Sequence, residues 1–187
     1  MLEVELKAAL LPEQADVLPN VLAALHFSEQ PAVQQTDVYF NAPDRDFRKT
    51  DEALRLRTVV TLPDGAAQTL VTYKGPKLDK TSSTRRELET AAEDFETMRQ
   101  LFCALGYTAV YTVKKTRRSF TCGAKTVCLD SVDGLGDFME LETVLPDESD
   151  RETAVQELLT LLDALGVARE ALTRKSYLEL LMASATV

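Results

Sequence analysis

The chain has 187 residues, of which 45% are hydrophobic and 27% are charged, a composition ordinary for a soluble globular protein. We expect one domain over residues 1–187, because this length is enough for a full hydrophobic core. The 21 basic and 30 acidic side chains give a net charge of −9, which argues against general nucleic-acid binding.

Alternation of polar and apolar residues with a period of two predicts about eight strands. The first covers residues 2–8. Two further segments, 54–60 and 68–74, flank a Pro-Asp-Gly turn and are expected to form a hairpin. The others are expected over residues 35–40, 83–90, 109–121, 125–132 and 137–144. This number of strands is typical of a closed antiparallel barrel.

Helical patterns lie between and after the strands. They cover residues 12–25, 93–105, 151–165 and 168–183. Pro12 suits the beginning of the first helix, whereas Pro19 should kink or split it. Residues 77–84 are expected to form a loop, either a lid on the site or a solvated connection.

The histidine and cysteine content limits the classes of active site that the chain can form. His26 is the single histidine, which argues against Ser-His-Asp triads and multi-histidine zinc sites. The three cysteines, Cys103, Cys122 and Cys128, lack metal-ligand spacing, so we expect buried or half-buried reduced thiols. The apolar runs are too short for a membrane span and the N-terminal segment is charged, so we expect a cytoplasmic protein with no membrane partner.

Charged side chains recur at alternate positions in several predicted strands. The sets are Glu3, Glu5 and Lys7; Arg55 and Arg57; Arg85, Glu87 and Glu89; Lys115 and Arg117; and Glu140 and Glu142. Alternate positions of a strand point to the same face. One such strand alone would be interpreted as half-exposed, with its charges in water. Their recurrence instead predicts charged faces inside the barrel.

These faces suit a ligand that brings divalent metal and negative charge together. The acidic pairs Glu3/Glu5 and Glu140/Glu142 suit Mg²⁺ or Mn²⁺, which prefer carboxylate, phosphate and water oxygens. Arginine grips phosphate with two hydrogen bonds and lysine acts as a point charge, so the basic set suits a triphosphate. That set is Lys7, Arg55, Arg57, Lys74, Arg85, Lys115 and Arg117.

The motifs resemble, in order, those of the CYTH family, also called triphosphate tunnel metalloenzymes. This family includes class IV adenylate cyclases, thiamine triphosphatases and inorganic triphosphatases. The matching segments are E-x-E-x-K at Glu3–Lys7, D-x-Y-F at Asp37–Phe40, L-R-x-R at Leu54–Arg57, Y-K-G-P at Tyr73–Pro76, R-x-E-x-E at Arg85–Glu89, K-x-R at Lys115–Arg117 and a long closing segment at Asp130–Glu142.

The resemblance implies an α+β fold, an eight-stranded antiparallel β-barrel flanked by helices, with a triphosphate tunnel inside. It implies that Glu3, Glu5, Glu140 and Glu142 hold the metal, helped by Glu87, Glu89 or Asp130. The seven basic residues would hold the triphosphate. Within these sets we expect Glu5, Lys74 and Arg117 to be catalytic.

The similarity is greatest to class IV adenylate cyclases, through Thr72–Pro76 and Thr84–Glu89, and it implies that ATP is converted to cyclic AMP and pyrophosphate. Bacterial cyclases of this family carry a His-Phe pair shortly before the first glutamate, where this sequence has Met1-Leu2. Metal-dependent hydrolysis of inorganic or thiamine triphosphate therefore stays open. So does a non-catalytic nucleotide- or polyphosphate-binding protein. For the final helix, a homodimer face and a barrel cover both stay open.

Overall fold

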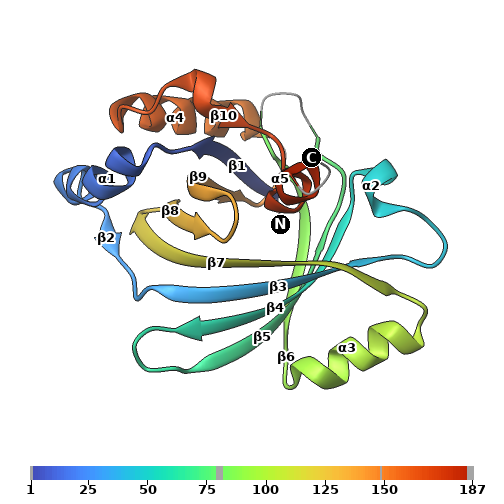
Figure 1. Cartoon of the computed structure of the whole chain (residues 1–187). Helices are drawn as coiled ribbons and strands as arrows, with labels where there is room; N and C mark the ends of the chain where they lie inside the picture. The colour runs from blue at the N-terminus through green and yellow to red at the C-terminus, as the bar shows by residue number, and fades with distance from the viewer. Residues whose placement is uncertain (1, 79–81, 148, 185–187) are drawn as a thin grey trace.

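The computed structural model describes residues 2–78, 82–147 and 149–184. Eight strands form a closed antiparallel barrel in the order β1-β6-β5-β4-β3-β7-β8-β9, and β9 pairs back with β1 (Figure 1). They are β1 (Leu2–Ala9), β3 (Val33–Asn41), β4 (Ala53–Thr61), β5 (Ala67–Lys74), β6 (Arg85–Ala92), β7 (Thr108–Cys122), β8 (Lys125–Val132) and β9 (Gly136–Leu145). The predicted fold class is confirmed.

Strand β1 closes the barrel, and its two edges are held differently. Eight residue pairs join one edge to β9. Along the other edge, two pairs join β1 to β6, the Ser83 N–H donates to the Glu5 carbonyl at 2.9 Å, and two pairs join β1 to the short strand β10 (Leu172–Thr173). Three separate segments thus complete this edge. Another short strand, β2 (Ser28–Glu29), pairs with β7.

Helices surround the barrel. They are α1 (Pro12–Ala24), α2 (Phe47–Thr50), α3 (Phe95–Ala104), α4 (Arg151–Ala164) and α5 (Tyr177–Ser184), with a 3₁₀ turn at Arg169–Ala171. Helices α3 and α4 begin after Asp94 and Asp150, and the Asp94 carboxylate accepts a hydrogen bond from the Thr97 N–H at 2.7 Å. Within the described residues, no helix combines the length and apolar character that crossing a membrane requires.

The hydrophobic core lies between the outer wall of the barrel and the helices. Val4 and Leu6 of β1 point outward and pack with Leu22 of α1 and Leu158 of α4, and all four are at most 2% exposed. A second cluster joins β3 and β4 to α3, and a third joins Tyr177 and the rest of α5 to one end of the barrel. Because the apolar faces of the strands are used outside, their charged faces are left for the interior.

Three predictions about local structure are wrong. Helix α1 is not split at Pro19, since Leu18 and Leu22 anchor it on the core. The final helix begins at Tyr177, because the preceding Leu172–Thr173 segment pairs with β1. Cys103 and Cys122 are exposed, whereas Cys128 is buried as expected, and all three thiols are free.

The predicted loop at residues 77–84 falls partly on residues 79–81, which lie outside the described residues. Ser82 and Thr84, at its far end, are 1% and 0% exposed, so this part of the connection is packed and not solvated. Ser83 lines the central cavity and its N–H binds β1. Ser83 therefore contributes to the wall of the barrel.

Candidate functional site

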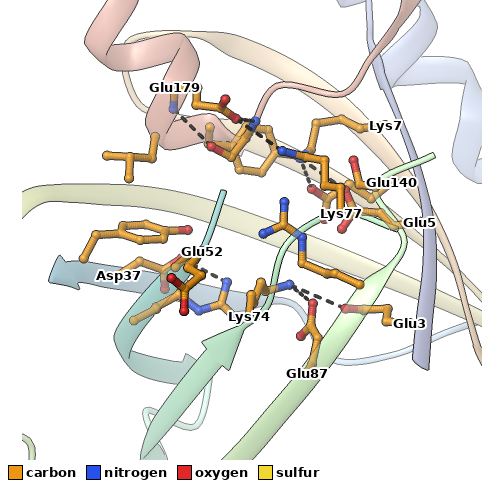
Figure 2. Close-up of a pocket in the computed structure, with 18 of the residues that line it drawn as sticks. Glu3, Glu5, Lys7, Asp37, Glu52, Lys74, Lys77, Glu87, Glu140 and Glu179 are labelled. Atoms are coloured by element: carbon orange, nitrogen blue, oxygen red, sulfur yellow. Dashed lines mark hydrogen bonds and ion pairs between the residues drawn. The ribbon is translucent and has the colours of Figure 1, made fainter. Parts of the chain in front are cut away.

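The alternate charged positions of the strands point into one cavity of about 580 Å³ inside the barrel (Figure 2). The strand pleat explains this on β1, where Glu5 and Lys7 face the cavity while Val4 and Leu6 face the outer core. Among the residues predicted to bind metal or triphosphate, Asp130 does not line the cavity, and all the others do. Residues far apart in the sequence are thus brought around a single space.

Three carboxylates converge where β1 pairs with β9. Glu5 and Glu142 are direct cross-strand partners. One oxygen of each of Glu5, Glu140 and Glu142, the acidic triad, lies within 4.8 Å of the other two. Lys7 Nζ lies 3.2 Å from Glu5 Oε1 and 3.1 Å from Glu140 Oε1. The Arg117 guanidinium contacts Glu140, and its Nη1 lies 3.4 Å from Glu142 Oε1.

The acidic triad is short of positive charge. Burial raises the pKa of Glu142 to about 8; Arg117 opposes this shift and the neighbouring glutamates add to it. Burial also opposes ionisation of Glu140, yet Lys7 and Arg117 hold its pKa well below the ordinary value. Glu5 Oε1 is buried and accepts no well-aligned hydrogen bond, although Lys7 Nζ is 3.2 Å away. An oxygen-only donor set with uncompensated charge fits a hard divalent cation.

A second acidic pair, Glu3 of β1 and Glu87 of β6, lies on either side of Lys74. Lys74 Nζ is 3.5 Å from Glu3 Oε2 and closer still to Glu87. Burial and a hydrogen bond with Glu3 raise the pKa of Glu87 to about 8. Burial opposes ionisation of Glu3, but Lys74 and Glu87 hold its pKa at about 2. Burial thus favours the neutral form of Glu87, while Lys74 favours the ionised form of Glu3. Glu89 has a 45% exposed side chain and accepts from Thr72 Oγ1 at 2.8 Å.

On β3 and β4, Asp37 anchors two of the predicted phosphate-binding arginines. Arg57 donates from Nε and Nη2 to the two oxygens of Asp37 at 2.6 and 2.7 Å, and Arg55 Nη1 lies 3.6 Å from Asp37 Oδ2. Burial works against ionisation of Asp37, but the charges of Arg55 and Arg57 hold its pKa at about 2. This carboxylate fixes the two guanidinium groups before any ligand arrives.

The lowered pKa of Asp37 predicts acid-dependent stability. The ionised form is favoured in the folded chain, so its contribution is present above the ordinary pKa of 3.8 and is lost as the pH falls towards about 2. We expect the difference in unfolding free energy between the unaltered chain and Asp37→Asn to shrink by about 2 kcal/mol from pH 5 to pH 2. Urea titrations across this range would measure it. A constant difference would contradict the assignment.

Asp130 lies behind the cavity wall and joins β8 to β7. It is 1% exposed, and Arg117 donates to both of its oxygens at 2.6 Å. Lys115 Nζ and the Tyr177 hydroxyl donate to Oδ2 at 2.7 and 2.9 Å. Burial opposes ionisation of Asp130, but Arg117 and Lys115 keep its pKa lowered. Protein donors thus engage both oxygens, an arrangement that supports Lys115 and Arg117 in place.

The cavity lining also includes residues that the sequence patterns did not single out, among them Asp51, Lys77 and Tyr177. Lys77 donates from Nζ to Asp51 Oδ1 at 2.7 Å, and Arg85 donates to the carbonyls of Gly75 and Asp51 at 3.2 and 3.4 Å. Tyr177 lies on α5 beside Lys7. Lys77 directly follows the Y-K-G-P motif, which is a weak signal. Asp51 ends a four-residue helix and Tyr177 begins α5, and neither position shows a pattern of its own.

Comparisons with known proteins agree with this geometry. A candidate adenylate cyclase of Methanocaldococcus jannaschii is 41% identical over 96% of this chain and 98% of its own length. The adenylate cyclase CyaB of Aeromonas hydrophila is 30% identical over 99% of this chain and 91% of its own. A solved structure from Pyrococcus horikoshii is 37% identical, covers 97% of this chain and 99% of its own, and superposes with a TM-score of 0.88. Residues 1–177 match the CYTH domain, and the chain belongs to the CYTH family.

Proposed function

We propose that this protein is a class IV adenylate cyclase, which converts ATP to cyclic AMP and pyrophosphate with a divalent metal. The observation that carries the proposal is the juxtaposition of the acidic triad and the basic side chains in one cavity. The names of the M. jannaschii and A. hydrophila relatives support this choice of reaction.

In this proposal Glu5, Glu140 and Glu142 hold Mg²⁺ or Mn²⁺, and Glu3, Glu87 and Glu89 offer further carboxylates. The bound metal supplies positive charge that lowers the pKa of the attacking hydroxyl and neutralises phosphate oxygens. We assign Asp130 to the support of Lys115 and Arg117, since its oxygens already accept hydrogen bonds from them.

The basic residues bind the triphosphate and stabilise the charge that moves during the reaction. The ribose 3′ hydroxyl loses its proton to solvent and its oxygen forms a bond to the α-phosphorus. The bond from that phosphorus to the bridging oxygen breaks, and pyrophosphate leaves with the electron pair. We assign Lys74 and Arg117 to the stabilisation of negative charge on the leaving group, because both are cations that line the cavity. Lys7, Arg55, Arg57, Arg85 and Lys115 hold the phosphate chain in this proposal.

Hydrolysis of a triphosphate is the second candidate function. One observation favours it, namely that the basic side chains around the cavity would bind a triphosphate whatever organic group it carries. In that reaction water, and not a ribose hydroxyl, attacks the terminal phosphorus.

A panel of substrates separates the two functions. The purified chain is incubated with Mg²⁺ or Mn²⁺ and with ATP, tripolyphosphate or thiamine triphosphate. We expect cyclic AMP and pyrophosphate from ATP, and chelation of the metal should abolish both. Release of orthophosphate from tripolyphosphate, without cyclic AMP from ATP, would show a triphosphatase. Binding of ATP without any turnover would leave a nucleotide-binding protein.

We also propose a cytoplasmic protein with no nucleic-acid partner. The net charge of −9 supports the second part of this proposal. Helix α5 turns Tyr177 and Leu181 towards the barrel, where both are buried. This packing supports the role of α5 as a cover on the barrel in preference to a homodimer face.

A further inference from the structure

We infer that Tyr177, the first residue of α5, is a positioning residue whose ring holds Lys7 and Lys115 in place for the phosphate chain. The inference rests on the proposed binding of a triphosphate in the cavity. It does not depend on whether the bound triphosphate is cyclised or hydrolysed.

The ring of Tyr177 brings together cations from two strands that are not neighbours. Lys7 Nζ lies 4.4 Å from the ring centroid and Lys115 Nζ lies 4.9 Å from it. Lys7 belongs to β1 and Lys115 to β7, and neither strand pairs with the other in the described barrel. Tyr177 is 6% exposed, so both ammonium groups meet the ring away from bulk water, where a cation–π contact is strongest.

An aromatic ring can hold lysines in position for a phosphate chain in a way that a carboxylate cannot. Lys7 is drawn towards Glu5 and Glu140, and Lys115 towards Asp130. Each carboxylate fixes a lysine but also cancels the positive charge that a phosphate would need. The ring attracts the ammonium groups through its negative face and carries no net charge. It can therefore hold both lysines without adding another negative charge beside the phosphate chain.

The rest of the tyrosine fixes the ring itself. Its hydroxyl donates to Asp130 Oδ2 at 2.9 Å, and its ring meets the Phe138 ring edge to face at a centroid distance of 5.2 Å. Leu181, one turn further along α5, packs in the same cluster and is 7% exposed. The ring and the hydroxyl thus have separable roles, the first on the two lysines and the second on Asp130.

Calorimetric titration of the full chain with tripolyphosphate, in the presence of Mg²⁺, tests the inference. Tripolyphosphate carries no ribose, so its binding is independent of cyclase activity. We expect Tyr177→Leu to raise the dissociation constant about tenfold or more, whereas Tyr177→Phe, which keeps the ring, should stay within about twofold of the unaltered chain. Leu181→Ala is the matched control, because it loosens the same helix without touching a charged group, and its affinity should be unchanged.

Several results would overturn the inference. Unchanged affinity in Tyr177→Leu would do so, and so would equal losses in Tyr177→Leu and Leu181→Ala, which would point to general packing. A large loss in Tyr177→Phe would assign the effect to the hydroxyl, and this result would overturn the inference even if the leucine variant does not fold. Tripolyphosphate binding without cyclic AMP formation would refute the cyclase alone. No binding of tripolyphosphate by the unaltered chain would refute the premise of the inference.

Discussion

Replacing Glu142 by glutamine is expected to lower metal-dependent turnover about 10²-fold or more while leaving the barrel folded. Glu142 is one of three carboxylates whose oxygens converge within 4.8 Å, and it faces Glu5 directly across β1 and β9. The amide keeps the shape of the side chain but removes its charge, so the site loses affinity for a divalent cation. Initial rates measured over a range of Mg²⁺ concentrations would show the loss, and Glu5→Gln should behave in the same way.

Stability should move in the opposite direction to activity in Glu142→Gln. In the metal-free chain the Glu142 carboxylate is buried beside other acids, and this raises its pKa to about 8. Glutamine is neutral without taking up a proton, so the free energy of unfolding near pH 7 should be unchanged or higher. Glu29→Gln is the control, since Glu29 forms an exposed ion pair with Arg118 at 2.8 Å, remote from the cavity. Wild-type turnover in both Glu5→Gln and Glu142→Gln would refute the metal site.

The second large effect is expected in stability, from Asp130→Ala. This change leaves Lys115 and Arg117 buried without the carboxylate to which both donate at 2.6–2.7 Å. Removal of one partner from a buried ion pair typically costs about 3–5 kcal/mol. We expect a loss of that size in the free energy of unfolding from urea titrations, together with weaker triphosphate binding in any fraction that stays folded.

Asp163→Ala provides a matched control for Asp130→Ala. Arg169 binds Asp163 with the same two-oxygen geometry, at 3.0 and 2.6 Å, but both side chains are about half exposed. An exposed pair of this kind contributes roughly 0–1 kcal/mol. Similar losses of unfolding free energy in Asp130→Ala and Asp163→Ala would show that burial of the ion pair does not cause the loss in Asp130→Ala. Asp130→Asn adds a test of the ligand assignment: an unchanged Mg²⁺ affinity is expected if Asp130 supports Lys115 and Arg117, and a large loss would restore it as a metal ligand.

Much of the barrel was predictable because each strand carries its own signal. Strand β7, expected over residues 109–121, covers Thr108–Cys122, and β8 has the predicted bounds 125–132. The period of two also assigned Glu5 and Lys7 to one face and Val4 and Leu6 to the other. The bounds of a strand and the face to which each side chain points are local properties, so the alternation of polar and apolar residues predicts them.

Partnerships between strands were not predictable in this way. The resemblance offered Asp130 as a helper to the metal ligands, yet its direct cross-strand partner is Arg117 on β7. The predicted beginning of the final helix was wrong for the same reason, because pairing of Leu172 and Thr173 with β1 overrides their helical pattern. Tyr177 contacts Lys7 across 170 positions of sequence, which no local pattern can reveal.

Along β1, the odd-numbered residues from 3 to 7 face the cavity and the even-numbered residues from 4 to 8 face the outer core. Residues that bind the ligand and residues that stabilise the fold therefore alternate within one strand. Val4 and Leu6, 0% and 2% exposed, hold the barrel to its helices, while Glu5 and Lys7 between them face the cavity. A slip of β1 by one residue would place carboxylate and ammonium groups in the apolar shell and aliphatic groups around the phosphates. A misregistered molecule would therefore be both unstable and unable to bind its ligand. A register error in β1 therefore removes ligand binding and stability together. It does not leave a well-folded molecule that lacks ligand binding.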